Sequence, residues 1–155
     1  MECISVFDML KIGIGPSSSH TLGPWRAAER WIHHLKKEDL FNKTTHIKVD
    51  LFGSLSLTGL GHATDLAIIL GLAGADPEYF PTEEIESLVA FIKFSKELKF
   101  GHEKVIPFDP QLDIIFNKDF LPFHPNGITF KSFNNGTEIS SDTYYSIGGG
   151  FVVRE

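Results

Sequence analysis

The spacing of hydrophobic residues along the chain predicts where its helices and strands lie. Residues 23–37 carry an apolar side chain at every third or fourth position, which is typical of a helix with one buried face. Residues 45–52 instead alternate between apolar and polar side chains, as a half-buried strand does. Residues 62–72 are apolar on most sides, so we expect a second, buried helix there. A glycine-rich turn over residues 53–61 is expected to lead into it.

The second half of the chain changes from a helical pattern to a strand pattern. Thr82 and the two glutamates after it favour the start of a third helix, which we expect to end near Gly101. Asn135 and Gly136 form a strong hairpin signal between two later apolar runs. The predicted strands there are residues 104–108, 112–116, 128–133 and 137–147, and residues 4–10 are predicted as a strand or a turn. Helices mostly precede strands, so we predict one α+β domain over residues 1–155, with a mixed β-sheet and about three helices.

Composition limits the classes of partner. The chain has 155 residues, of which 42% are hydrophobic, which is enough for one domain with a core of its own. Its net charge of −6 and the absence of a basic stripe argue against nucleic acid. The sequence shows no apolar run of about 18–20 residues and no signal-peptide pattern, so we expect a cytoplasmic protein that does not enter a membrane. The single cysteine, Cys3, excludes an internal disulfide and a cysteine-ligated cluster held by this chain alone.

Residues 12–21, IGIGPSSSHT, place hydroxyl groups and an imidazole directly before the first predicted helix. The free N–H groups and the dipole of a helix N-terminus favour an anion. A helix cap would explain one of these hydroxyls, with the others merely solvated, but a cap leaves the remaining polar side chains unexplained. We therefore predict a site for a carboxylate or phosphate. Its residues are Ser17, Ser18, Ser19, His20 and Thr21.

Residues 53–65, GSLSLTGLGHATD, repeat this design before the second predicted helix. The positive helix end disfavours an imidazolium, so His62 is expected to stay neutral and able to accept a proton. A partly buried histidine that donates to a carbonyl is the alternative, and the residues leave both open. For His124 in HPNG a surface turn is slightly favoured. The run YYSIGGG indicates either a close backbone approach or a flexible exit.

The other histidines carry no site prediction. His33 and His34 are expected at the surface of the first helix, and His46 and His102 show no clustering. No pair of histidines has metalloprotease spacing, and no nucleophile elbow is present.

Four separated motifs resemble those of a known enzyme family. They are SVFDMLKIGIGPSSSHTLGPWRAA, LFGSLSLTGLGHATD, FHPNG and YYSIGGGFV. Over nearly the whole chain they resemble the β domain, or β subunit, of iron–sulfur-dependent bacterial L-serine dehydratases. The resemblance implies a fold similar to the allosteric substrate-binding domain of some phosphoglycerate dehydrogenases. It also implies conversion of L-serine to pyruvate and ammonia with a [4Fe–4S] cluster and no pyridoxal phosphate. The α domain, which carries the cluster-binding cysteines in that family, is absent from this chain.

The resemblance also implies roles for the predicted site residues. His62 is the candidate base or proton shuttle, His20 a positioner or acid, and His124 a weaker supporting residue. The expected substrate-binding residues are Ser17, Ser18, Ser19, Thr21, Thr58 and His124, and no metal ligand is expected on this chain. The expected partners are the serine dehydratase α domain or subunit, the substrate L-serine and a second copy in a homodimer.

Two alternatives stay open. The domain could bind serine or another small acid for regulation without joining the active site, or it could serve only to dock the α half. The catalytic base could equally belong to that half.

Overall fold

The computed structural model describes residues 19–59 and 63–155. The predicted segment over residues 4–10 and the predicted site residues Ser17, Ser18 and His62 lie outside this part. The helices are α2 (Leu22–Lys37), α3 (Gly53–Gly59), α4 (Ala63–Leu72), the 3₁₀ helix η1 (Thr82–Glu84), α5 (Ile85–Ser95) and α6 (Pro110–Asp113). The strands are β1 (His46–Leu51), β2 (Glu97–Phe100), β3 (Lys104–Pro107), β4 (Ile114–Phe116), β5 (Gly127–Asn134), β6 (Thr137–Gly148) and β7 (Phe151–Arg154).

Five strands form one mixed sheet in the order β4-β1-β5-β6-β7. Strand β1 runs parallel to β4, while the other neighbouring pairs are antiparallel. The alternation predicted for residues 45–52 is confirmed, because Ile47, Val49 and Leu51 are buried on one face of β1. Asn135 and Gly136 both adopt positive φ and connect β5 to β6, as the hairpin signal predicted. The predicted α+β fold with a mixed sheet is therefore confirmed.

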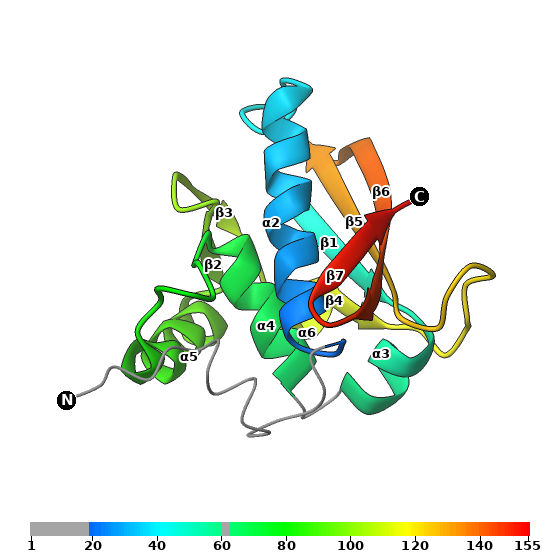
Figure 1. Ribbon diagram of the computed structural model, residues 1–155. Coiled ribbons are helices and arrows are strands. Elements are labelled where there is room, and N and C mark those ends of the chain that lie inside the picture. The colour runs from blue at the N-terminus through cyan, green and yellow to red at the C-terminus, as the bar shows by residue number, and fades with distance from the viewer. Residues whose placement is uncertain (1–18, 60–62) are drawn as a thin grey trace.

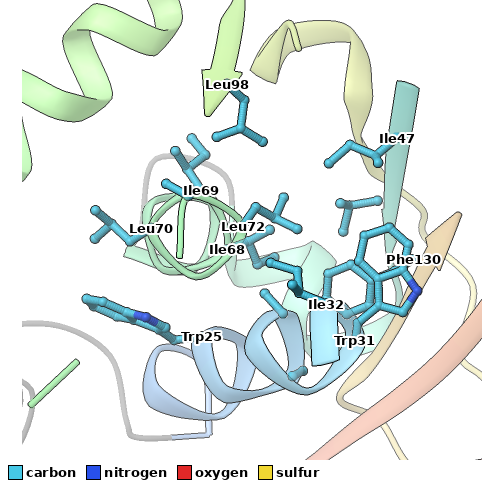
Figure 2. Close-up of a cluster of buried hydrophobic side chains, with 14 of the residues drawn as sticks. Trp25, Trp31, Ile32, Ile47, Ile68, Ile69, Leu70, Leu72, Leu98 and Phe130 are labelled. Atoms are coloured by element: carbon cyan, nitrogen blue, oxygen red, sulfur yellow. The ribbon is translucent and has the colours of Figure 1, made fainter. Parts of the chain in front are cut away.

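Helix α2 covers one face of this sheet, and α4 packs beside it (Figure 1). The ring of Trp31 stacks on Phe130 of β5 with centroids 5.0 Å apart, and Figure 2 shows the two rings side by side in the buried cluster. The predicted apolar face of α2, with Trp25, Ala28, Ile32 and Leu35, is buried throughout. Helix α4 is also buried along most of its length, as its uniform hydrophobicity predicted.

Gly71 allows α4 to lie very close to α2. A Cβ atom at this position would lie 2.7 Å from the backbone oxygen of Trp25 and 2.8 Å from the Cβ of Ala28. The indole of Trp25 donates a 2.8 Å hydrogen bond to the carbonyl of Ala75, just beyond α4. The two helices therefore form a tight pair that fixes where their N-terminal ends lie.

The predicted third helix ends six residues earlier than expected. Helix α5 stops at Ser95, and Lys96 follows in the left-handed conformation with φ 55°. The next residues form β2, paired with β3, and its buried Phe100 stacks on Phe41. The prediction of a helix to Gly101 was wrong because the pattern changes to strict alternation after Ser95.

The predicted glycine-rich turn over residues 53–61 is also wrong in its first part, which is helix α3. Gly53 begins it with φ +57°, and a Cβ atom there would lie 2.3 Å from the backbone oxygen of Pro125. Leu55 of α3 is fully buried. Contacts with another part of the chain, not local sequence, explain this short helix.

The three glycines after β6 form the turn into β7. Gly148, Gly149 and Gly150 all have positive φ, and a Cβ atom on Gly150 would lie 2.7 Å from Leu22. Strand β7 then pairs with β6. The close approach predicted as one alternative for YYSIGGG is present at Gly150, against the Leu22 side chain, and the flexible exit stays a prediction. None of the described helices has the length and hydropathy needed to cross a membrane.

Candidate functional site

The polar residues that precede α2 meet the start of α3. The two ring nitrogens of His20 lie 2.9 Å from the hydroxyl of Ser19 (Nδ1) and 3.0 Å from the hydroxyl of Ser54 (Nε2). Ser54 is the second residue of α3, so the imidazole joins two helix starts that lie 34 residues apart in the sequence. In the neutral ring one nitrogen donates and the other accepts. The arrangement is a continuous hydroxyl–imidazole–hydroxyl chain.

Two buried hydroxyl groups hold the backbone of this segment. Thr64 in the first turn of α4 donates a 2.6 Å hydrogen bond to the carbonyl of His20. Ser146 of β6 donates a 2.6 Å hydrogen bond to the carbonyl of Ser19. Both donors are at most 1% exposed, so these bonds are shielded from water. The position of His20 is therefore set by α4 and by the sheet together.

The loop before β5 supports the same region. The amide of Asn126 donates a 3.1 Å hydrogen bond to the carbonyl of Ser146, and the Asn126 backbone N–H donates to Nδ1 of His124 at 3.1 Å. The carbonyl of Pro125 accepts from the backbone N–H of Ser54 at 2.9 Å. The side-chain oxygen of Asn126 is buried and has no hydrogen-bond partner among the described residues. HPNG thus packs against α3.

Burial lowers the pKa of His20 below its ordinary value of 6.5, and the hydrogen bond at Ser54 opposes this change. Desolvation disfavours the imidazolium, because the charged ring loses water contacts that the two hydroxyls replace only in part. The neutral form is therefore favoured at neutral pH, and it can accept a proton or hold a polar group in place.

The structure separates the predicted site residues into two groups. Ser19, His20 and Thr21 lie together at the start of α2, where Thr21 is fully buried and its carbonyl accepts from Trp25 N–H. The Thr21 side chain makes no cap hydrogen bond with the helix. Thr58 donates instead to the carbonyl of Ser54, within α3, and its side chain is exposed.

Four residues in this region were not among the predicted site residues: Ser54, Thr64, Asn126 and Ser146. Each lies within a motif that the sequence had already marked as polar or glycine-rich, so a signal was present. What the sequence lacked was the packing of α4 on α2 and the contacts of β6 with Ser19 and of the loop before β5 with α3, which bring these motifs to one place.

Two further features of the structure lie apart from this site. His46, for which no cluster was predicted, lies 2.9 Å from the buried carboxylate of Asp113. A hollow of about 830 Å³ between the end of α4 and α5 is lined by residues such as Tyr79, Leu88 and Phe91. No predicted site residue lines that hollow. Among the described residues no group of three or more His, Cys, Asp or Glu could hold a metal ion.

The fold and the site define an α+β domain that carries a small polar site where helix starts meet the end of a strand. The family model for the serine dehydratase beta chain matches residues 5–155, and the chain belongs to this family.

Full-length relatives agree with the family assignment. The L-serine dehydratase of Haemophilus influenzae is 48% identical over 154 residues, and the L-serine dehydratase TdcG of Escherichia coli K12 is 47% identical over 153 residues. Each match covers 98% of this chain and 34% of the relative. The L-serine dehydratase of Helicobacter pylori is 38% identical and is covered to the same 34%. The chain therefore spans about a third of the length of the curated relatives that it matches.

Proposed function

We propose that this chain is the β part of an L-serine dehydratase and supplies one side of its active site. In this reaction L-serine loses its α-proton and its β-hydroxyl group as water, and the resulting aminoacrylate is hydrolysed to pyruvate and ammonia. The family assignment and the relatives named L-serine dehydratase support the reaction. The share of the relatives that this chain covers supports a second, larger α part as its partner.

The observation that carries the proposal is the placement of His20. Its ring is fixed at both nitrogens by Ser19 and Ser54, and hydrogen bonds hold the carbonyls of Ser19 and His20. Because both ring nitrogens are already hydrogen-bonded, His20 suits a positioner that orients the hydroxyls of Ser19 and Ser54 toward the serine carboxylate or hydroxyl. It suits a resident acid less well, because its pKa is lowered. His62 stays the candidate base or proton shuttle.

The remaining assignments stay predictions. Ser17, Ser18, Ser19 and Thr21 would bind the substrate carboxylate and hydroxyl, with Thr58 and His124 in support. A homodimer and a cytoplasmic location also stay predictions.

The residues of this chain do not fit an iron–sulfur cluster of their own. Its one cysteine, Cys3, lies outside the described residues, and a [4Fe–4S] cluster takes several thiolates. We therefore propose that the α part holds the cluster, that no pyridoxal phosphate takes part, and that this chain contributes binding and proton-handling groups.

The rim of the site supports a covering partner. Leu57 of α3 and Phe120 and Phe123 of the loop before β5 are more than half exposed. Phe120 contacts the start of α3 at Gly53, and Phe123 packs against Tyr145 of β6. Exposed apolar side chains gathered around a polar site are typical of a surface that a partner covers.

Anaerobic reconstitution with the cysteine-bearing α part tests the proposal. Pyruvate formed from L-serine would be measured for the parent chain, for His62→Asn and for His102→Asn as the matched control. His102 is exposed and has φ 61°, a conformation that asparagine tolerates. We expect His62→Asn to lose between about a hundredfold and ten-thousandfold in turnover, as removal of a general base does.

The control is expected to keep the parent's turnover. Full turnover by His62→Asn would place the base in the α part. No turnover by the reconstituted parent, with the cluster shown to be present, would contradict the proposal itself.

A further inference from the structure

A second pocket, of about 410 Å³, lies between α2 and the last two strands. Helix α2 and β7 lie side by side at this place (Figure 1). Most of the side chains that line the pocket are basic or can donate hydrogen bonds. They are Arg30, His33, His34, Lys37, Tyr144 and Arg154, and none of them belongs to the site around His20.

Two of the permanent cations of this pocket are not neutralised. Arg30 donates to the backbone carbonyl of Val152, and neither Arg30 nor Lys37 forms an ion pair with a carboxylate among the described residues. A guanidinium has five N–H donors, so Arg30 keeps donors for a ligand. Arg30 and Lys37 both line this pocket without a carboxylate ion pair among the described residues, on a chain with a net charge of −6.

The carboxylates near the pocket are already engaged by other groups. Glu29, which itself lines the pocket, accepts a 3.1 Å hydrogen bond from Arg26. Asp142 accepts from Arg154 at 3.0 Å and from the indole of Trp31 at 3.1 Å. Glu29 shares Arg26 with Glu78, and Asp142 pairs with Arg154, so neither carboxylate forms an ion pair with Arg30 or Lys37.

Tyr144 supplies a second, independent sign of a ligand. Its side chain is 1% exposed, yet its hydroxyl makes no hydrogen bond with the described residues where it lines the pocket. Burial raises the pKa of Tyr144, Arg154 opposes this, Asp142 adds to it and Arg30 opposes it least, so the hydroxyl keeps its proton. The ring is buried while the hydroxyl is open to the pocket, where a ligand oxygen would accept its hydrogen bond.

We propose that this pocket binds a small oxyanion, the carboxylate or phosphoryl group of a metabolite-sized molecule. Arg30 and Lys37 attract its charge, and the Tyr144 hydroxyl donates a hydrogen bond to one of its oxygens. Charge-assisted bonds of this kind are about twice as strong as neutral ones. The pocket is a binding site separate from the proposed active site and does not depend on the proposed reaction.

Titration of the 155-residue chain with inorganic phosphate, and separately with succinate, tests the proposal. Binding would be followed by NMR chemical shifts at constant ionic strength, with chloride as the reference salt. Tyr144→Phe and Lys37→Gln would be compared with the matched variants Tyr145→Phe and Lys36→Gln. The Tyr145 hydroxyl donates to Glu155, and Lys36 pairs with Glu103, so both controls lie outside the pocket. Each variant's melting temperature would show that it is folded.

We expect at least one of the two anions to bind with a dissociation constant in the millimolar range or tighter. Tyr144→Phe and Lys37→Gln are each expected to weaken binding by about tenfold, and the controls by less than about twofold. Tighter binding of phosphate would identify a phosphoryl ligand, and tighter binding of succinate a carboxylate. Absence of binding by both anions would overturn the proposal, as would equal weakening by the pocket variants and their controls.

Discussion

The His20 side chain links the stability of the fold to pH. Burial lowers the pKa of His20 in the folded chain below the value of 6.5 that it has when unfolded. Below pH 6.5 the unfolded chain therefore binds a proton at His20 more readily than the folded chain does. The free energy of unfolding falls as the pH drops from 6.5 toward the lower pKa of the folded state. We expect His20→Gln to flatten the decline in the free energy of unfolding below pH 6.5, measured by urea unfolding at a series of pH values.

The control for this experiment is His102→Asn, which changes an exposed ring. It is expected to leave the slope of stability against pH as in the parent. If His20→Gln also keeps the parent's slope, the burial of this imidazole does not control its protonation.

Gly53 sets the start of α3 and with it the position of Ser54. Gly53→Ala would introduce both a strained φ of +57° and a contact of 2.3 Å with the backbone oxygen of Pro125. We expect a loss of about 2 kcal/mol or more, seen as a fall in Tm of roughly 5 °C or more.

The matched variant is Gly136→Ala, where φ is +88° but no atom lies within 4 Å of the added Cβ. It carries the strain alone and is expected to cost about 1 kcal/mol. Equal melting temperatures for the two variants would show that the contact with Pro125 does not fix α3.

At the scale of elements, the pair α2 and α4 depends on Gly71. Helix propensity alone predicts that Gly71→Ala adds about 1 kcal/mol of stability. The new Cβ would lie 2.7 Å from the carbonyl oxygen of Trp25, a backbone atom that cannot move aside cheaply. Overpacking of this kind costs about 1–3 kcal/mol, so we expect a net loss of stability in thermal unfolding. A higher Tm for Gly71→Ala than for the parent would mean that α2 and α4 can shift apart at little cost to accept the added Cβ.

The sequence predicted those elements whose local pattern agrees with their packing. Helix α2, strand β1 and the β5–β6 hairpin follow directly from apolar spacing and from Asn135–Gly136. Helix α3 was missed because burial of Leu55 against distant residues decides its structure. Strand β2 was missed because its alternating pattern after Ser95 is short and resembles the end of the predicted helix.

The candidate site was predictable to a similar extent. Hydroxyls and a histidine before a helix pointed to Ser19, His20 and Thr21. The contribution of Ser54, Thr64 and Ser146 depends on contacts between residues 34, 44 and 127 positions apart in the sequence. Local patterns hold no information about such pairs.

On the scale of the whole molecule, this chain covers about a third of its curated relatives. The polar site carries exposed apolar side chains around it, and the one cysteine cannot build a cluster alone. We therefore expect the purified chain to be colourless after anaerobic preparation and unable to form pyruvate from L-serine. Absorption spectra and an iron assay check this expectation, and a brown, iron-containing preparation would contradict it.

The central claim, that His20 and its neighbours form one side of the active site, is tested most directly by steady-state kinetics of the enzyme reconstituted with the α part. We expect His20→Gln to lower kcat/KM for L-serine by at least about tenfold, while the reconstituted complex still assembles. His102→Asn is expected to keep the parent's kcat/KM. An assembled His20→Gln enzyme with the parent's kcat/KM would contradict the claim. The hydrogen bonds of His20 would then serve only to hold the starts of α2 and α3 together.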